Sequence, residues 1–377
     1  MCTNAWSDRA VALLSADGLR HNVREIRRTM KKDVQLCGVV KADAYGHGAV
    51  PTARILKEEG VSWLAVSTAK EALELRSAGI DGPILVLGVV PVDFAETAGR
   101  LAISLSVHEQ AYGEALKDAA VRAGTAVHAH VKLDTGMTRL GYATVPDDLT
   151  DTVTGIRRLF SGTGLIAEGL FSHFAASESD EAFSKEQIRR YLSVYERLRD
   201  LPFAVRHIGN SGALAMCESP FNMCRSGIAL YGGQPDPLHP DLDLKPVMSV
   251  FGRIVQIKTL SQTETVGYSR TVRLPAGARV AVVEIGYADG VIRRWEETGY
   301  MLVRGQKAPL AGRVSMDRLV INISELDVSA GDYALYFGTD KSGAVLSADD
   351  VAARAGTISY ELFCRISARV PRIWESA

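Results

Sequence analysis

At residues 39–48 the chain reads Val39-Val40-Lys41-Ala42-Asp43-Ala44-Tyr45-Gly46-His47-Gly48. The apolar segment 36–40 predicts a β-strand, and Lys41 follows at its carboxyl end. Small residues, a tyrosine and two glycines come directly afterwards, which leaves backbone space beside the amine. A lysine held in this way suits Schiff-base formation better than it suits a solvated surface charge. An ordinary strand-end lysine before a glycine-rich turn is the alternative that these ten residues leave open.

Composition and charge restrict the class of protein. A length of 377 residues predicts about two domains. With 47% hydrophobic and 23% charged residues, the chain has the balance of a globular protein with a large core. The net charge of −1 gives no basic footprint for nucleic acid. We expect no membrane span, because no apolar run approaches the roughly 18 residues required, and residues 1–8 lack the layout of a secretory signal.

The cysteines argue against a disulfide framework and against a metal site. There are five, an odd number, and no two form a C-x-x-C pair; they are Cys2, Cys37, Cys217, Cys224 and Cys364. We therefore expect no metal and a reducing, cytoplasmic location.

Between about residue 12 and residue 232, short β-rich runs alternate with longer helical patterns. The expected strands are 34–40, 63–66, 84–87, 103–107, 126–133, 165–171, 207–208 and 228–231, and the expected helices include 49–59, 69–78, 110–122 and 180–199. Eight alternations favour an α/β fold with a closed parallel (β/α)8 barrel. An open doubly wound sheet is the alternative, disfavoured because no G-x-G-x-x-G follows the first strand.

The polar residues fit the barrel, in which chemistry takes place at the carboxyl ends of the strands. At or near those ends lie Lys41, Arg139, His173, Asn210, Ser211 and Arg225. The sequence therefore places its candidate chemistry on one rim.

After Pro246 the sequence predicts a second, mostly β C-terminal domain. Its expected strands are 250–258, 266–273, 279–285, 300–303, 307–316, 319–323 and 333–337, with one helix near 348–356. The proline-rich segment 233–240 is the expected boundary. We assign residues 12–239 to the barrel, and residues 240–377 together with residues 1–11 to the β-rich domain.

Further motifs make the chain resemble the bacterial alanine racemases, fold-type III enzymes that use pyridoxal 5′-phosphate (PLP). The resemblance covers about residues 19–372. Besides the lysine decamer it rests on the segments 132–137, 139–141, 172–175, 210–211, 225–232, 266–268, 285–290, 316–317 and 359–361, which occur in the family's order.

The resemblance implies a two-base racemisation, in which one group removes a proton from Cα and another returns it on the opposite face. Lys41 would hold PLP as a Schiff base and serve as one base, and Tyr268 would be the other. A tyrosine, with an ordinary pKa of about 10, needs neighbours that lower its pKa to act as a base. His173 and Arg225 would lie near the ring and help to carry that proton.

Arg225 corresponds to the family's arginine that faces the pyridine nitrogen of PLP, with His207 as its supporting partner. Because arginine only donates hydrogen bonds, it leaves that nitrogen unprotonated. The ring is then a weaker electron sink, which we expect to suppress transamination. On this hypothesis Arg225→Glu raises the rate of transamination, and an unchanged rate would contradict it.

The resemblance also implies the remaining binding residues. The phosphate of PLP would be bound by Ser211 and by the backbone of Gly227 and Ile228, since loops after the last two strands of such barrels commonly bind phosphate. Other cofactor-binding residues would be Tyr45, His173, Asn210 and Tyr360.

The substrate carboxylate would be bound by Arg139, whose planar fork suits a carboxylate, and by the backbone N–H of Met316. Lys132, carbamylated in some members, would orient Arg139. Tyr287 and Asp317 would support the site from nearby.

In the family, Tyr268 and Met316 come from the partner subunit, which implies a head-to-tail homodimer with shared active sites. The resemblance further implies an isomerase that forms D-alanine, as a peptidoglycan precursor or in alanine catabolism. A serine or broad-specificity racemase is an alternative, although Tyr360 should narrow the pocket. A PLP-dependent decarboxylase is disfavoured by Arg225, and a non-catalytic PLP-binding protein by the β-rich domain that carries Tyr268.

Overall fold

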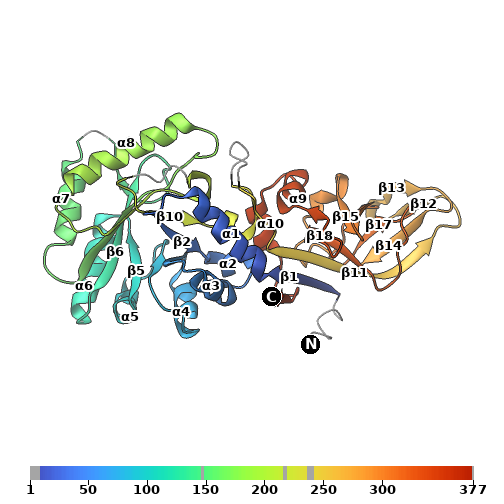
Figure 1. The fold of residues 1–377 in the computed structure, drawn as a ribbon, viewed down its shortest axis with the longest axis horizontal. Coiled ribbons are helices and arrows are strands. Elements are labelled where there is room, and N and C mark those ends of the chain that lie inside the picture. Colours follow the sequence, from blue (N-terminus) through green and yellow to red (C-terminus); the bar gives the residue numbers. More distant parts are fainter. Residues whose placement is uncertain (1–8, 146–147, 215–218, 236–241, 376–377) are drawn as a thin grey trace.

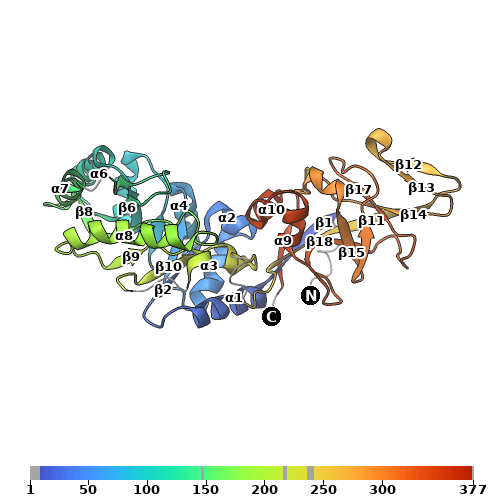
Figure 2. The ribbon, with the colours of Figure 1, turned by 90° about the horizontal axis from the view of Figure 1, so that it is seen from above.

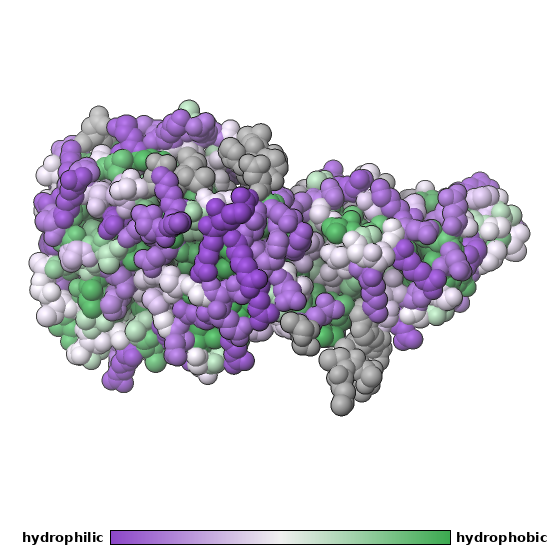
Figure 3. Space-filling view, in the orientation of Figure 1, coloured by the Kyte–Doolittle hydropathy of each residue, from purple (hydrophilic) through white to green (hydrophobic). Residues whose placement is uncertain are grey.

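The computed structural model describes residues 9–145, 148–214, 219–235 and 242–375. Two bodies lie side by side along the long axis, a helix-wrapped barrel and a β-rich domain (Figure 1). Hydrophilic side chains cover much of the face seen in Figure 3, with apolar patches among them.

Eight parallel strands close the barrel, because each pairs with two neighbours around the ring. In ring order they are β2 (Gln35–Val39), β3 (Trp63–Val66), β4 (Ile84–Val86), β5 (Ile103–Val107), β6 (Val127–Asp134), β8 (Leu165–Phe171), β9 (Val205–His207) and β10 (Met223–Ser226). The short strand β7 (Tyr142–Ala143) pairs beside the end of β6. The expected (β/α)8 barrel is confirmed.

Helices surround this ring (Figures 1 and 2). They are α1 (Ala16–Thr29), α3 (Ala49–Glu58), α4 (Ala69–Ser77), α5 (Ala95–Arg100), α6 (Gln110–Arg122), α7 (Thr150–Leu159) and α8 (Glu181–Arg197), with a 3-10 turn at Val92–Phe94. Each expected helix overlaps an observed one. In α1, Leu19, Val23 and Ile26 are fully buried at helical spacing, so one apolar stripe faces the core.

The expected eighth strand is wrong. Residues Ile228–Tyr231 form a 3-10 turn, and the eighth strand is β10, five residues earlier. All four residues of the turn are fully buried, and a short buried apolar run has no periodicity that separates strand from helix. The true strand is hidden because it carries Arg225 and Ser226, which are polar.

The second domain is built on the long strand β11 (Met248–Thr259). The sheet order is β16-β15-β18-β11-β1-β20. Off this path, β14 pairs with β11, β17 pairs with β14, and β19 pairs with β18. The bounds are β1 (Ala10–Ser15), β14 (Arg279–Val283), β15 (Tyr300–Val303), β16 (Gln306–Pro309), β17 (Leu319–Asn322), β18 (Tyr333–Thr339), β19 (Val345–Leu346) and β20 (Arg372–Glu375). The mostly β character expected for this domain is confirmed.

Three expectations for the second domain need correction. Residues 266–273 form two paired strands, β12 (Glu264–Val266) and β13 (Val272–Leu274), on either side of a 3-10 turn at Tyr268–Arg270. The strand expected at 307–316 ends at Pro309. Besides α9 (Ala348–Arg354) there is a second helix, α10 (Ser359–Arg365). Another 3-10 turn spans Arg293–Glu297.

One of the two expected domain boundaries falls within a strand that the sequence did not reveal. The boundary drawn at residue 12 falls inside β1, which pairs with β11 and β20 of the second sheet. The boundary at residues 239 and 240 lies outside the described residues. The division into residues 12–239 and 240–377 therefore stays a proposal.

Candidate active site

Lys41 begins a strained turn at the mouth of β2. In the segment labelled α2 (Lys41–Gly46), four non-glycine residues, 42–45, have φ between 52° and 54°, a left-handed conformation that costs about 1–2 kcal/mol per residue. Hydrogen bonds hold it: the backbone N–H of Ala42 donates to Glu71 Oε1 (2.8 Å), and Ala49 donates to Asp43 Oδ1 (2.7 Å). Strained backbone of this kind is typical of functional sites.

The second domain packs against this turn. Arg372 Nε donates to the carbonyl of Gly46 (3.1 Å), and α10 lies beside α2 (Figures 1 and 2). A Cβ at Gly46 would lie 2.6 Å from the carbonyl oxygen of Phe363, so only glycine permits this approach. The position of Lys41 therefore depends on both domains.

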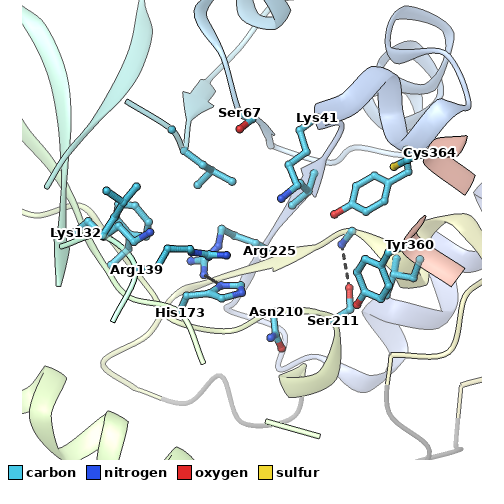
Figure 4. A pocket seen from close by; sticks show the side chains of 18 residues that line it. Lys41, Ser67, Lys132, Arg139, His173, Asn210, Ser211, Arg225, Tyr360 and Cys364 are labelled. Carbon is cyan, nitrogen blue, oxygen red and sulfur yellow. Dashed lines mark hydrogen bonds between the residues drawn. The ribbon is translucent and has the colours of Figure 1, made fainter. Parts of the chain in front are cut away.

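A cavity of about 600 Å³ opens at the carboxyl ends of the barrel strands (Figure 4). It gathers most of the residues that the sequence singled out: Lys41, Tyr45, Lys132, Arg139, His173, Asn210, Ser211, Arg225, Gly227, Ile228 and Tyr360. In Figure 4 the side chains of Lys132, Arg139, His173 and Arg225 lie on one side, and Ser211 and Tyr360 lie on the other.

The cavity also contains residues that the sequence did not indicate. Ser67 directly follows β3, and Gly88 lies two residues after the end of β4, so the rule that chemistry lies at carboxyl ends could have found them. Cys364 lies on α10, a helix whose pattern was missed, and no local signal marks it.

Two lysines and two arginines line this cavity: Lys41, Lys132, Arg139 and Arg225. Burial, and then the charge of Arg139, lower the pKa of Lys41. Burial and the cations Arg139 and Arg225 lower the pKa of Lys132 to about 8. Burial and Arg225 lower the pKa of His173 well below its usual value, so this imidazole is neutral. The cavity is therefore suited to bind an anion while its lysines lose protons more easily than exposed lysines do.

Arg225 is fixed by several partners at one end of the cavity. It donates to His207 Nδ1 (2.5 Å), His173 Nδ1 (3.0 Å) and the carbonyl of Ser172 (2.8 Å). Its guanidinium carbon lies 5.6 Å from the centre of the Phe171 ring, and the residue is only 4% exposed. Arg225 thus offers a rigid donor to whatever ring or acceptor lies in front of it.

Ser211, Gly227 and Tyr45 form the other end. The backbone N–H of Gly227 donates to Ser211 Oγ (2.9 Å), and Ser211 Oγ lies 3.2 Å from Ser226 Oγ. A Cβ on Gly227 would lie 2.5 Å from Tyr45 Oη, so the missing side chain leaves room where hydroxyl and backbone donors converge. Such a cradle, at the end of the last two strands, fits a phosphate group.

The remaining predicted residues are dispersed. His207 is fully buried behind Arg225. Tyr268, Tyr287 and Met316 lie on the second domain, 68%, 39% and 53% exposed, and among the described residues they do not line this cavity. Asp317, which follows Met316 in the sequence, accepts a hydrogen bond from Arg369 (2.8 Å).

Two further properties concern the described part of the chain. It contains no group of three histidine, cysteine or carboxylate side chains placed to hold a metal ion. None of its helices is both long enough and apolar enough to cross a membrane.

Comparison with known families agrees with this arrangement. The N-terminal domain of alanine racemase matches residues 14–235, and the C-terminal domain of alanine racemase matches residues 247–374. Alanine racemase 2 of Caldanaerobacter subterraneus subsp. tengcongensis is 40% identical over 367 residues, which are 96% of this chain and 93% of that protein. The chain is therefore an isomerase of the amino-acid racemase class.

Solved structures give the same result. The alanine racemase of a D-cycloserine-producing Streptomyces lavendulae superposes with a TM-score of 0.91 at 33% identity, covering 98% of this chain and 97% of that one. The alanine racemase of Bacillus anthracis with bound L-Ala-P has a TM-score of 0.87 at 31% identity, covering 98% and 95%. The chain belongs to the alanine racemase family.

Proposed function

We propose that this protein interconverts L-alanine and D-alanine with PLP bound in the cavity. The two bases would be Lys41 of the chain that forms the cavity and Tyr268 of the partner subunit. The observation that carries the proposal is the layout of one cavity, which contains a half-buried lysine, a phosphate cradle and a fixed arginine. The related racemase that binds L-Ala-P supports alanine as the substrate.

The residues present fit PLP. Ser211, Gly227 and Ile228 would hold its phosphate, Lys41 would bond to its carbonyl carbon, and Arg225 would face its ring nitrogen. His173, Tyr45 and Tyr360 would line it. When bound, PLP supplies a carbonyl that takes up the substrate amine and withdraws electrons from Cα.

Lys41 is prepared for proton transfer by its surroundings. Its lowered pKa leaves more of the neutral amine, the form that accepts a proton. Arg139 lines the same cavity and would bind the substrate carboxylate, which would turn Cα towards Lys41. Tyr360 lines the same cavity, and its bulky ring would favour a substrate with a small side chain such as methyl.

The second base must approach the opposite face of Cα. Among the described residues, the only tyrosines that line the cavity are Tyr45 and Tyr360. Burial raises the pKa of both of those phenols, so they stay protonated at neutral pH and are not available to accept a proton. Tyr268 and Met316 are exposed on the second domain, and large exposed side chains of this kind are typical of interfaces. A head-to-tail dimer would place them over the cavity of the other subunit.

Chiral chromatography tests this function. Purified protein is incubated with PLP and L-alanine or, in parallel, L-serine. We expect D-alanine to form rapidly and D-serine to form slowly, because Tyr360 narrows the cavity. Abundant D-serine would assign a serine or broad-specificity racemase, and the absence of any D-product would contradict racemisation. The Lys41→Ala variant is the control for background conversion.

A further inference from the structure

A chain of polar side chains continues from Arg225 through the interior of the barrel. Arg225 Nη1 contacts His207 Nδ1 (2.5 Å), and His207 Nε2 contacts His130 Nδ1 (2.9 Å). His130 Nε2 then contacts Glu168 Oε2 (3.0 Å), to which Ser104 Oγ also donates (2.5 Å). The five residues come from β10, β9, β6, β8 and β5, so the chain crosses the whole barrel.

Both histidines of this chain are completely buried, while its two ends differ. His130 and His207 have no exposed surface, and Arg225 borders the cavity. The side chain of Glu168 is 18% exposed, so its charge is partly solvated. Buried polar groups need partners, and here each imidazole nitrogen has one.

Only one arrangement of protons satisfies every contact. A guanidinium only donates, so His207 Nδ1 must accept and His207 must carry its proton on Nε2. That proton is donated to His130 Nδ1, so His130 must also carry its proton on Nε2. The last donation ends on the Glu168 carboxylate, which only accepts.

The charge states agree with this arrangement. Burial, and then Arg225, lower the pKa of His207 well below its usual value. Burial also lowers the pKa of His130, and this effect outweighs the opposing effect of the hydrogen bond that His130 donates to Glu168. Burial alone would raise the pKa of Glu168, but the hydrogen bonds from His130 and Ser104 leave it lowered. The imidazoles are therefore neutral between a cation and an anion.

The local backbone is shaped around this chain. Along β6 and β8, Ala129 pairs with Ala167 and His130 pairs with Gly169, so Glu168 is the extra residue of a bulge. Bulges next to active sites re-aim a side chain. A Cβ at Gly169 would collide with the His130 ring, so the position must be glycine. The Phe171 ring stacks on His207, with centres 4.8 Å apart and planes 6° apart.

We propose that Glu168, acting through His130 and His207, is a positioning residue that holds the Arg225 guanidinium against the cofactor ring. The inference deepens the proposed function and rests on it for the role of Arg225. A carboxylate at the far end polarises both imidazoles in turn, which makes His207 Nδ1 a stronger acceptor for Arg225. Removing the charge of Glu168 should therefore weaken the hydrogen bond between His207 and Arg225, although Arg225 itself is left unchanged.

The first measurement needs no variant. Nitrogen-15 NMR of protein labelled in the histidine rings reports which ring nitrogen carries the proton, with and without PLP. We expect His130 and His207 to be neutral and protonated on Nε2. A proton on Nδ1 of either ring, or a doubly protonated ring at neutral pH, would overturn the proposal.

The second measurement uses Glu168→Gln, which keeps the shape and removes the charge. We expect the ring signals of His207 to move although residue 168 does not touch it. We expect kcat to fall by about 10-fold, as for partners that orient other active-site ligands, with a smaller change in KM for alanine. Unchanged His207 signals together with unchanged kcat would overturn the proposal.

His128→Gln is the matched control. His128 Nδ1 lies 2.9 Å from the other carboxylate oxygen of Glu168, but His128 is not part of the chain to Arg225. We expect this variant to keep both the His207 signals and kcat. If both variants lowered only the thermal midpoint, Glu168 would be merely structural. A wild-type protein with the expected ring signals but no D-alanine would refute the proposed function and leave the proton arrangement intact.

Discussion

The rim of the barrel and the exposed loops of the second domain were both expected to supply active-site residues, but they are built in opposite ways. On the rim, Arg225 is 4% exposed and has several partners, and burial lowers the pKa of Lys41. On the second domain, Tyr268 and Met316 are 68% and 53% exposed. One region is complete within a single chain, and the other has large side chains that another surface would cover. This contrast motivates the shared site.

The largest expected effect comes from separating the two bases. We expect Lys41→Ala and Tyr268→Phe each to lower racemisation by about 100-fold to 10,000-fold. Co-expression with two different tags allows the mixed dimer to be purified. It should regain about half of the wild-type activity, because one of its two sites has both residues intact.

The mixed dimer distinguishes a shared site from a site within one chain. If both bases came from the same chain, every site of the mixed dimer would lack one of them, and no activity would return. Wild-type protein that carries both tags and passes through the same purification is the control. A fully active protein that light scattering shows to be a monomer would also contradict a site shared between two subunits.

A smaller effect is expected at the phosphate cradle, where Gly227→Ala tests how tightly the rim is built. The new Cβ would lie 2.5 Å from Tyr45 Oη, and Tyr45 is buried against Tyr231, with ring centres 5.0 Å apart. Crowding of this kind costs about 1–3 kcal/mol in the free energy of unfolding. We expect a lower thermal midpoint and weaker PLP binding in an absorbance titration.

Gly212→Ala is the matched control on the same rim. Its new Cβ would meet nothing closer than Ser177 Oγ at 3.2 Å. We expect a smaller loss of PLP affinity than for Gly227→Ala. Equal losses for the two variants would mean that the space beside Tyr45 has no special role.

The same contrast explains what could be predicted from the sequence. Lys41 and His173 were placed correctly because each follows an apolar strand, β2 and β8, whose pattern is local. The strand that carries Arg225 was missed because its polar residues are stabilised by partners far along the chain, such as the carbonyl of Ser172. A periodicity argument does not see contacts of that separation.

Residues outside the strands required other information. Tyr360 was found only through the family resemblance, because the helix α10 that carries it was not predicted. The contact between His130 and Glu168 depends on the register of β6 and β8 and on a bulge. Tyr268 lies in a 3-10 turn between two strands where the pattern predicted one strand. Its role still depends on a partner surface, which a single chain does not contain.

The smallest expected effect concerns the pH dependence of stability through Lys132, whose pKa burial and Arg139 lower from 10.5 to about 8. Between these two values the unfolded chain binds more protons at this position than the folded protein does. The contribution of Lys132 to the free energy of unfolding therefore rises as the pH increases through this window. In Lys132→Met this contribution is missing, so urea unfolding without PLP should show the wild-type protein gaining stability relative to the variant as the pH rises.

Lys70→Met, at an exposed position of α4, controls for the loss of one positive charge. The buffers must be free of carbon dioxide, because a neutral lysine amine otherwise reacts with it to form a carbamate. A difference in the free energy of unfolding between wild type and Lys132→Met that stays constant across the window would show that the pKa of this lysine is not lowered. The rim of the barrel would then treat its lysines much as an exposed surface does.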